Sequence, residues 1–393
     1  MNFKTILLGS AAALAVTGAQ AADLSIADPV DYVRVCDAFG SGYWYIPNTD
    51  TCIKLGGRAR FEILFHEEKA IGGDYYETTY DTYGSVSVSF RQTLTGTGAT
   101  TTTVGFATTA SVDFSYNVST VDTRHSASWQ FVSSGILKTT VKSMTEYGVL
   151  TGYSELTFKS DNDDSNTDDV RLAHVWLELG HVLMGHTDST FNYGGVFNFD
   201  SSNHGNTETD QIRLSWAMNG FGLQLGLEDP RDRWSTSIGD YGMPDIVGAI
   251  TAEHGHWDAK LSLGYADGSA GSAWAAQLGM TFDLDQWHAM DKFRVKVGFG
   301  DTTGGVSNSF LGSGGSGDSW LLNLSYQHYW SSTLSSALSY SFNDEGSAAD
   351  TTNVSLNLVW APVTGFSAGI EALYTDVGGD DSWSGKARIQ RTW

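Results

Sequence analysis

Charged residues recur at every second position of one segment near the N-terminus, IKLGGRARFEILFH. Its polar parity holds Lys54, Arg58, Arg60, Glu62 and His66. The other parity holds leucine, alanine, phenylalanine and isoleucine. Because successive side chains of a β-strand point to opposite faces, this strand would have one charged and one apolar face. Charges on one face could set up a field across a water-filled space, whereas the apolar face needs either a second sheet or lipid.

The N-terminal sequence MNFKTILLGSAAALAVTGAQA predicts a signal peptide over residues 1–21. It has a basic start, a short apolar run and small residues that favour cleavage before Ala22. We therefore expect an exported chain, with a periplasmic leader over residues 22–52 and a barrel domain over residues 53–393. No later stretch approaches the ~18 to 20 consecutive apolar residues of a transmembrane helix, so any crossing of a membrane would use strands.

The amino-acid composition limits which partners the chain could bind and which cellular compartment it could occupy. The formal net charge of -23 argues against nucleic acid, because phosphate binding needs clustered positive charge. The chain has 45 glycines and only 5 prolines, which suits strands joined by tight turns. Cys36 and Cys52 are the only cysteines, and in an exported chain they predict a disulfide. A metal site would need more ligands nearby than one aspartate.

From residue 145 onward, alternating segments of about ten residues are joined by connections that are short and long in turn. The short ones are 180–181, 219–220, 255–256, 330–331 and 361–365, with a longer exception at 284–291. The long ones are 160–169, 188–207, 229–244, 267–272, 300–317, 343–350 and 376–382. Transmembrane barrels have this asymmetry, with long extracellular loops on one rim. Sandwiches mix their connection lengths.

Tryptophan placement gives a second signal. Eight tryptophans share the apolar parity and stand beside a turn, a loop or the chain end: Trp216, Trp257, Trp274, Trp320, Trp330, Trp360, Trp383 and Trp393. A sandwich would bury tryptophans in mid-strand, whereas outward aromatics at both strand ends form the interfacial girdles of a barrel.

The sequence therefore predicts an all-β, transmembrane, antiparallel β-barrel. The segments after residue 145, one strand before it and a first strand at Ile53 give sixteen strands. Residues 85–134 show partial alternation and many threonines. If they add a hairpin to the wall, the count becomes eighteen, which is also even.

Several segments resemble the alphaproteobacterial general porins. They include VDYVRVCDAFGSGYWYIPNTDTCIKLGGRAR, TEYGVLTGYSELTF, LAHVWLELG, YGMPDIVGAI, PVTGFSAGIEALYT and the closing ARIQRTW. The resemblance implies a homotrimer in the outer membrane that passes small hydrophilic solutes without energy input. It also implies that residues 186–207 fold into the lumen. Outer membrane lipid, lipopolysaccharide and the barrel-assembly machinery, which recognises a terminal aromatic residue such as Trp393, are the expected partners.

In such a pore, selectivity depends on the electric field inside the lumen and on the width of the lumen. Asp188 and Asp200 of the inward loop could face a basic strip across the constriction, made of Arg58, Arg60 and Arg213. Alternatively, these aspartates only cap a surface loop. Further inward charges are expected to tune selectivity diffusely or to pair with one another: Glu62, Lys138, Lys142, Glu155, Lys260, Arg294, Lys296, Glu371, Lys386 and Arg388.

Other chemistry has no support in the residue spacing. The acidic run SDNDDSNTDD lacks the glycine and the closing glutamate of a calcium loop, and the histidines show no HExxH spacing. No catalytic constellation can be placed, so we expect neither an enzyme nor a bound cofactor or metal. A substrate-specific channel, which would need a lumen aromatic ladder or a converging cluster, and a soluble exported sandwich or adhesin are the alternatives.

Overall fold

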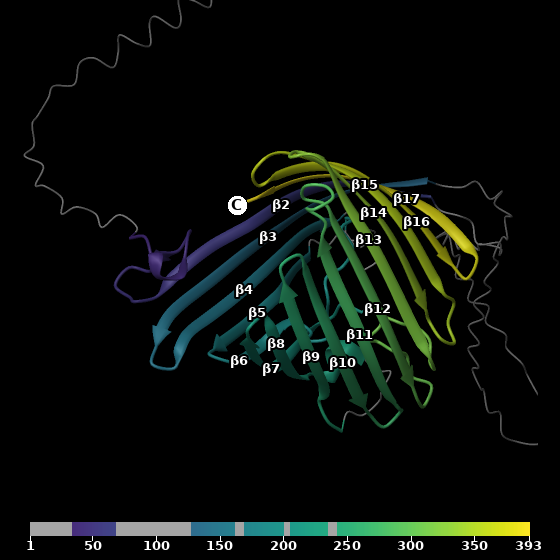
Figure 1. Ribbon diagram of the computed structural model, residues 1–393, viewed down its shortest axis with the longest axis horizontal. Coiled ribbons are helices and arrows are strands. Elements are labelled where there is room, and N and C mark those ends of the chain that lie inside the picture. The colour runs from purple at the N-terminus through teal and green to yellow at the C-terminus, as the bar shows by residue number, and fades with distance from the viewer. Residues whose placement is uncertain (1–33, 68–126, 162–168, 200–204, 235–241) are drawn as a thin grey trace, which may run out of the picture.

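The computed structural model describes residues 34–67, 127–161, 169–199, 205–234 and 242–393. Among them, seventeen strands form one antiparallel sheet, of which β1 is a two-residue outlier and the other sixteen form the wall (Figure 1). Each wall strand pairs with its neighbours in the sequence, and β17 pairs with β2 from Ser384↔His66 to Thr392↔Arg58. The wall is therefore an up-and-down barrel without a free edge.

Most wall strands reach the ~9 to 11 residues that cross a bilayer when tilted; β6 with 7 residues and β8 with 8 residues are shorter. The wall strands are β2 Cys52–Glu67, β3 Ala127–Thr145, β4 Gly148–Asp161, β5 Asp169–Leu179, β6 Val182–Asp188, β7 Glu208–Met218, β8 Phe221–Glu228, β9 Asp245–His254, β10 Trp257–Asp267, β11 Ser272–Asp283, β12 Lys292–Thr302, β13 Ser319–Ser331, β14 Leu334–Asp344, β15 Thr351–Val363, β16 Phe366–Val377 and β17 Asp380–Thr392. A five-residue helix, α2 Pro230–Trp234, follows β8. None of the described helices is long and apolar enough to cross a membrane.

Side chains alternate between the two faces of the wall as the sequence predicts. On β9, Ile246 is 45% exposed while its neighbour Val247 is fully buried. Large apolar side chains are exposed around the outer face, among them Phe61, Phe131, Leu177, Ile212, Leu263, Leu338, Leu356 and Ile370. A belt of this extent needs an apolar solvent, which the hydrocarbon of a membrane supplies.

The eighteen-strand alternative is wrong. β2 and β3 pair in one continuous register from Cys52↔Lys142 to Glu67↔Ala127, which leaves no place for a hairpin between them. The last part of the uncertain segment, from Ala127, belongs to β3 itself. The rest of the expected hairpin lies outside the described residues.

Connections on one rim are tight turns, and the residues within each turn explain its conformation. Asn219 and Gly220 between β7 and β8 both have positive φ, 51° and 82°, as a type I′ turn requires. Dipeptides also join β3 to β4, β5 to β6, β9 to β10, β13 to β14 and β15 to β16. Residues 284–291 form the single longer turn among the described connections of this rim. The predicted short connections of this rim are therefore confirmed. On the opposite rim the connection between β12 and β13 is long, residues 303–318, but the predicted long connection 376–382 is wrong, because only Gly378 and Gly379 separate β16 from β17.

The tryptophan girdle is also confirmed. Seven of the eight predicted tryptophans are exposed, and Trp257 is partly buried. The C-terminal residue closes the seam of the barrel, because Trp393 and Gly57 exchange two backbone hydrogen bonds of 3.1 Å. A Cβ on Gly57 would lie 2.6 Å from the Trp393 ring, so glycine is needed where the terminal indole crosses β2.

The described part of the leader is a small unit held on the short-turn rim. Cys36 and Cys52 form the predicted disulfide and are buried with Tyr43. Strand β1, Trp44–Tyr45, pairs with the start of β2, which begins at Cys52, one residue before the predicted boundary. The amino groups of Lys54 and Lys142 each lie 5.7 Å from the centre of the Tyr43 ring. The expected signal peptide lies outside the described residues.

Candidate functional site

The connection after β6 folds back into the barrel. Its first described part, residues 189–199, is called the internal loop below, and residues 205–207 lead into β7. It is bonded to inward-facing groups of eight consecutive strands: Lys260 on β10, Gln277 on β11, Arg294 on β12, Ser325 on β13, Ala337 on β14, Asn357 on β15, Glu371 on β16 and Lys386 on β17. The predicted inward fold of this connection is confirmed for these residues.

Three cations of the inner wall bind carbonyl oxygens of the internal loop. Lys260 donates to Asn192 at 2.9 Å. Arg294 donates to Gly195 at 2.5 Å, and Lys386 donates to Phe199 at 3.2 Å. Hydrogen bonds from a charged donor are stronger than neutral ones, so the three bonds hold the loop along its length. The sequence suggested that these cations tune selectivity diffusely or pair with one another; in the structure their ammonium and guanidinium groups bind the loop.

A chain of hydrogen bonds holds the Tyr193 side chain in place, and only one assignment of donors and acceptors along it is possible. Arg294 Nε can only donate, so it donates to Thr281 Oγ1 at 3.0 Å. Thr281 and the Tyr193 hydroxyl lie 2.6 Å apart, and Tyr193 donates to Asp258 at 2.8 Å. Burial, together with the hydrogen bond to the carboxylate, raises the pKa of Tyr193 to about 12. The phenol therefore stays protonated and keeps donating at neutral pH.

Glycines on the inner wall make room for the aromatic side chains of the internal loop. A Cβ on Gly279 of β11 would lie 2.0 Å from the Tyr193 ring. A Cβ on Gly369 of β16 would lie 2.8 Å from the Phe199 ring. No side chain larger than hydrogen fits at these positions while the rings stay in place.

A second connection, residues 303–318 between β12 and β13, also folds inward. Phe310 and Leu311 are completely buried, and Asn308 donates to the Trp274 carbonyl at 3.1 Å. The sequence predicted only one inward loop. It missed this one because residues 303–318 are mostly glycine and serine, and the three apolar side chains, Val306, Phe310 and Leu311, give no periodic signal.

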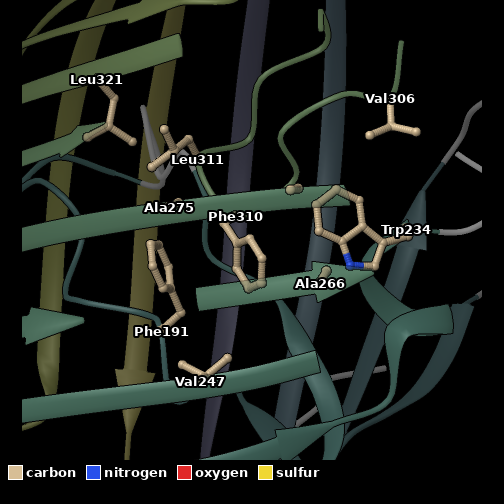
Figure 2. Close-up of a cluster of buried hydrophobic side chains, with 10 residues drawn as sticks. Phe191, Trp234, Val247, Ala266, Ala275, Val306, Phe310, Leu311 and Leu321 are labelled. Atoms are coloured by element: carbon tan, nitrogen blue, oxygen red, sulfur yellow. The ribbon is translucent and has the colours of Figure 1, made fainter. Parts of the chain in front are cut away.

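The two inward loops and helix α2 meet in a buried apolar cluster. Figure 2 shows the Phe310 ring between Phe191 of the internal loop and Trp234 of α2. Its centre lies 5.2 Å from that of Phe191 and 5.4 Å from that of Trp234. The other members are Val306 and Leu311 of the second connection and inward residues of β9, β10, β11 and β13: Val247, Ala266, Ala273, Ala275 and Leu321. Packing at these distances holds three connections together as one unit.

A buried ionic network lies beside this cluster. The Arg233 guanidinium is 2.8 Å from the Glu228 carboxylate and 3.5 Å from that of Asp245. It also donates to the Ser189 hydroxyl at 2.7 Å and stacks 4.3 Å from the centre of the Phe310 ring. One side chain thus links the ends of β8 and β9 to both inward loops.

The predicted basic strip of Arg58, Arg60 and Arg213 is not continuous in the structure. Arg388 donates to Glu62 at 2.8 Å, and the Phe199 ring covers the Arg388 guanidinium at 4.3 Å. Arg60 lies 3.9 Å from Glu62 and donates to Gln390 at 3.2 Å. These charges of β2 and β17 form a cluster at the far end of the internal loop.

The other predicted site residues do not converge with that cluster. Arg58 lies on β2 and Arg213 on β7, both partly buried and inward, and Asp188 is the exposed last residue of β6. Lys296 on β12 is almost completely buried, so it does not line a water path. Asp200 lies outside the described residues.

Sequence reasoning missed an aromatic pair on the wall of β3 to β5. The Tyr153 and Trp176 rings stack with centres 5.2 Å apart and planes 22° apart. Tyr153 donates to Glu155 at 2.5 Å, and Lys138 lies 3.2 Å from the same carboxylate. Tyr153 shares the parity of Glu155, so the alternation along β4 could have placed it inward.

The sequence profile of the porin subfamily matches residues 23–127 and 106–392. The chain belongs to the porin subfamily. Together with the closed barrel and its apolar outer face, this makes it an outer-membrane porin channel that crosses the membrane with its strands.

Known proteins agree with this assignment. Porin Omp2b of Brucella canis is 28% identical to this porin over 100% of both chains. The structure of the outer membrane channel DcaP of Acinetobacter baumannii is similar with a TM-score of 0.62 and 15% identity, covering 89% of this chain and 99% of that one. The trimer form of OmpT of Vibrio cholerae is similar with a TM-score of 0.54 and 10% identity, covering 88% and 100%. At these identities the two structures show the fold alone.

The ionic network gives a first prediction. Arg233→Met should lower the free energy of unfolding by about 3 to 5 kcal/mol, because two buried carboxylates lose their cation. Arg231→Met on the same short helix is the control, and it should change stability little because its side chain is exposed. Urea unfolding of the refolded porin in detergent measures both. Equal effects of the two substitutions would contradict the role of the network.

The glycines give a second prediction. Gly279→Ala should destabilise the porin by about 1 to 3 kcal/mol, because the added methyl group collides with the Tyr193 ring. Gly248→Ala on β9 is the matched control, since its Cβ would meet only Leu225 at an ordinary 3.7 Å. The same unfolding measurement applies. A neutral Gly279→Ala variant would show that the internal loop does not press against β11.

Proposed function

We propose that this porin is a passive, water-filled pore for small hydrophilic solutes and ions, and that it is not an enzyme. The observation that carries the proposal is Lys138, which points inward near the middle of β3 and still has 47% of its side chain exposed. An inward side chain inside a closed wall can be exposed only to a lumen. The partners of that side chain are ionic, which suits water in that lumen.

The proposed constriction lies between the internal loop and the opposite wall, β2 to β7. The loop thickens the wall from β10 to β17, so the remaining path runs past the inward residues of the facing strands. Arg58, Arg213 and Lys138 supply positive charge there, and Glu155 and Glu178 supply negative charge. Asp188, the exposed last residue of β6, would contribute to a field across the path.

The sign of selectivity follows from which charges stay available. The anchoring cations, Lys260, Arg294 and Lys386, already bind carbonyl oxygens. Selectivity would then depend on inward charges of the facing strands, such as Arg213, rather than on the total number of basic residues. A positive charge at that place would favour anions, although the whole chain is acidic.

A second candidate function is a channel that prefers one class of solute. The stacked Tyr153 and Trp176 rings, next to the Lys138–Glu155 ion pair, favour it. Aromatic faces beside polar groups can hold a solute with both an apolar face and hydroxyl groups. One stacked pair is a weaker feature than a ladder, so general diffusion remains the proposed function.

We further propose a homotrimer with its short-turn rim and its leader in the periplasm. The likeness to the trimer form of OmpT supports the trimer. The leader packs on the short-turn rim through Tyr43 and Lys142, and in barrels the short turns are periplasmic. The exposed terminal Trp393 would serve recognition by the assembly machinery, and the long loops would meet lipopolysaccharide.

Planar-bilayer recording tests the function. The refolded porin should give stepwise conductance that rises in proportion to salt concentration and does not saturate with added sugars. Saturation by one sugar, lost in Trp176→Ala, would favour the specific channel. No conductance from a correctly folded barrel would contradict both candidates.

Reversal potentials under a salt gradient test the selectivity. Arg213→Gln should lower the anion-to-cation permeability ratio by about fivefold, since a unit charge ~8 Å from the ion path favours an anion and disfavours a cation by about 0.5 kcal/mol each in water. Arg231→Gln removes the same charge from an exposed loop helix and should leave the ratio unchanged. If both variants behave alike, net charge rather than lumen charge sets selectivity.

A further inference from the structure

The longer turn on the short-turn rim brings two histidines and an aspartate together. His288 Nδ1 lies 3.1 Å from Asp291 Oδ1, and His328 Nδ1 on β13 lies 2.8 Å from Asp291 Oδ2. One ligand atom from each residue lies within 4.8 Å of the other two. The two imidazole rings have centres 4.6 Å apart. We propose that this group is a binding site for a transition-metal dication of the Zn²⁺ class.

The separations suit such an ion. Zn²⁺ binds imidazole nitrogen at about 2.0 to 2.1 Å and carboxylate oxygen at about 2.0 to 2.2 Å, so tetrahedral ligand atoms lie about 3.4 Å apart. The two nitrogen-to-oxygen distances, 3.1 Å to one oxygen of Asp291 and 2.8 Å to the other, are shorter than this, so both imidazoles would move slightly outward to admit the ion. His288 has a half-exposed side chain and can rotate to complete the site. Two nitrogens and one oxygen favour Zn²⁺ and similar ions over Mg²⁺ or Ca²⁺.

Surrounding groups already orient the carboxylate. Asp291 is 1% exposed, and it accepts hydrogen bonds from the Tyr326 hydroxyl at 2.5 Å and the Tyr329 backbone N–H at 2.9 Å. The Trp330 ring packs edge-on against His328 with ring centres 4.5 Å apart. Partners of this kind hold the ligands of metal sites in place. A water molecule would take the fourth position on the open side of His288.

The turn itself is built for this placement. The other described turns of this rim are tighter, but residues 284–291 are closed by a hydrogen bond from Leu284 N to Asp291 O of 2.8 Å. A second bond, from Met290 N to the Asp285 carboxylate at 2.9 Å, fixes the turn from inside. The extra length carries His288 over β13. A bound ion would join the turn to that strand, independently of conduction through the lumen.

Titration of the refolded, untagged mature chain with Zn²⁺ tests the proposal. Calorimetry should show one site per chain, and His288→Gln and His328→Gln should each weaken binding at least tenfold. Mg²⁺ should give no binding. Co²⁺ bound at the same site should show visible absorption bands, and these should disappear in both variants. Because His288 is half exposed, its replacement leaves the fold intact, which circular dichroism checks.

Two matched controls make the test specific. His256→Gln changes a histidine in a neighbouring turn of the same rim. His186→Gln changes a histidine of the other described cluster with potential ligands, which includes Asp210 and Asp232. Both should bind Zn²⁺ like the unchanged chain. The proposal is overturned if the unchanged chain does not bind Zn²⁺, if binding survives in His288→Gln and His328→Gln, or if His186→Gln alone abolishes it.

Discussion

The pairing of every backbone donor and acceptor along the wall is the constraint on which this structure depends. In hydrocarbon an unpaired N–H or C=O costs several kcal/mol, so a sheet can cross a membrane only if it closes on itself. Here closure is achieved between β17 and β2, the two ends of the barrel sequence. The terminal Trp393 completes the seam by bonding to Gly57. An even number of strands follows from closure, because an antiparallel meander closes in an antiparallel way only when its first and last strands run in opposite directions.

A closed wall encloses a space into which loops can fold, and the size of the inward side chains determines where they can pack. On β9 to β15 the inner face holds many glycine, alanine, serine and asparagine residues beside the larger Lys260, Arg294 and Lys296, whereas β2, β3 and β17 carry several large charged groups. Small residues let two loops lie close to the wall and offer hydroxyl and amide groups to their backbones. The asymmetry of the barrel interior is therefore encoded in side-chain size along the strands, not in the loops alone.

The alternation of apolar and polar residues predicted most of the wall strands. A strand with one lipid-facing and one water-facing side must have an apolar residue at every second position. For β9 the predicted residues 245–254 match the strand, and other strands differ mainly at their ends. The inward loop after β6 came from family resemblance, and residues 303–318 were missed. Loop placement depends on contacts such as Phe310 with Trp234, which join residues far apart in the sequence. No local pattern contains that information, and the same holds for His288 with His328.

The lumen cations show why a list of inward charges does not give selectivity. When a loop folds into a barrel, its backbone carbonyl oxygens leave bulk water, and each then needs a hydrogen-bond donor from the protein. Lys260, Arg294 and Lys386 meet that need, so their charge acts first on the loop. Removing such a cation would leave a carbonyl with fewer donors and free the loop, which changes pore width together with charge. Position relative to the internal loop, rather than sign alone, therefore separates a structural cation from one that acts on a passing ion.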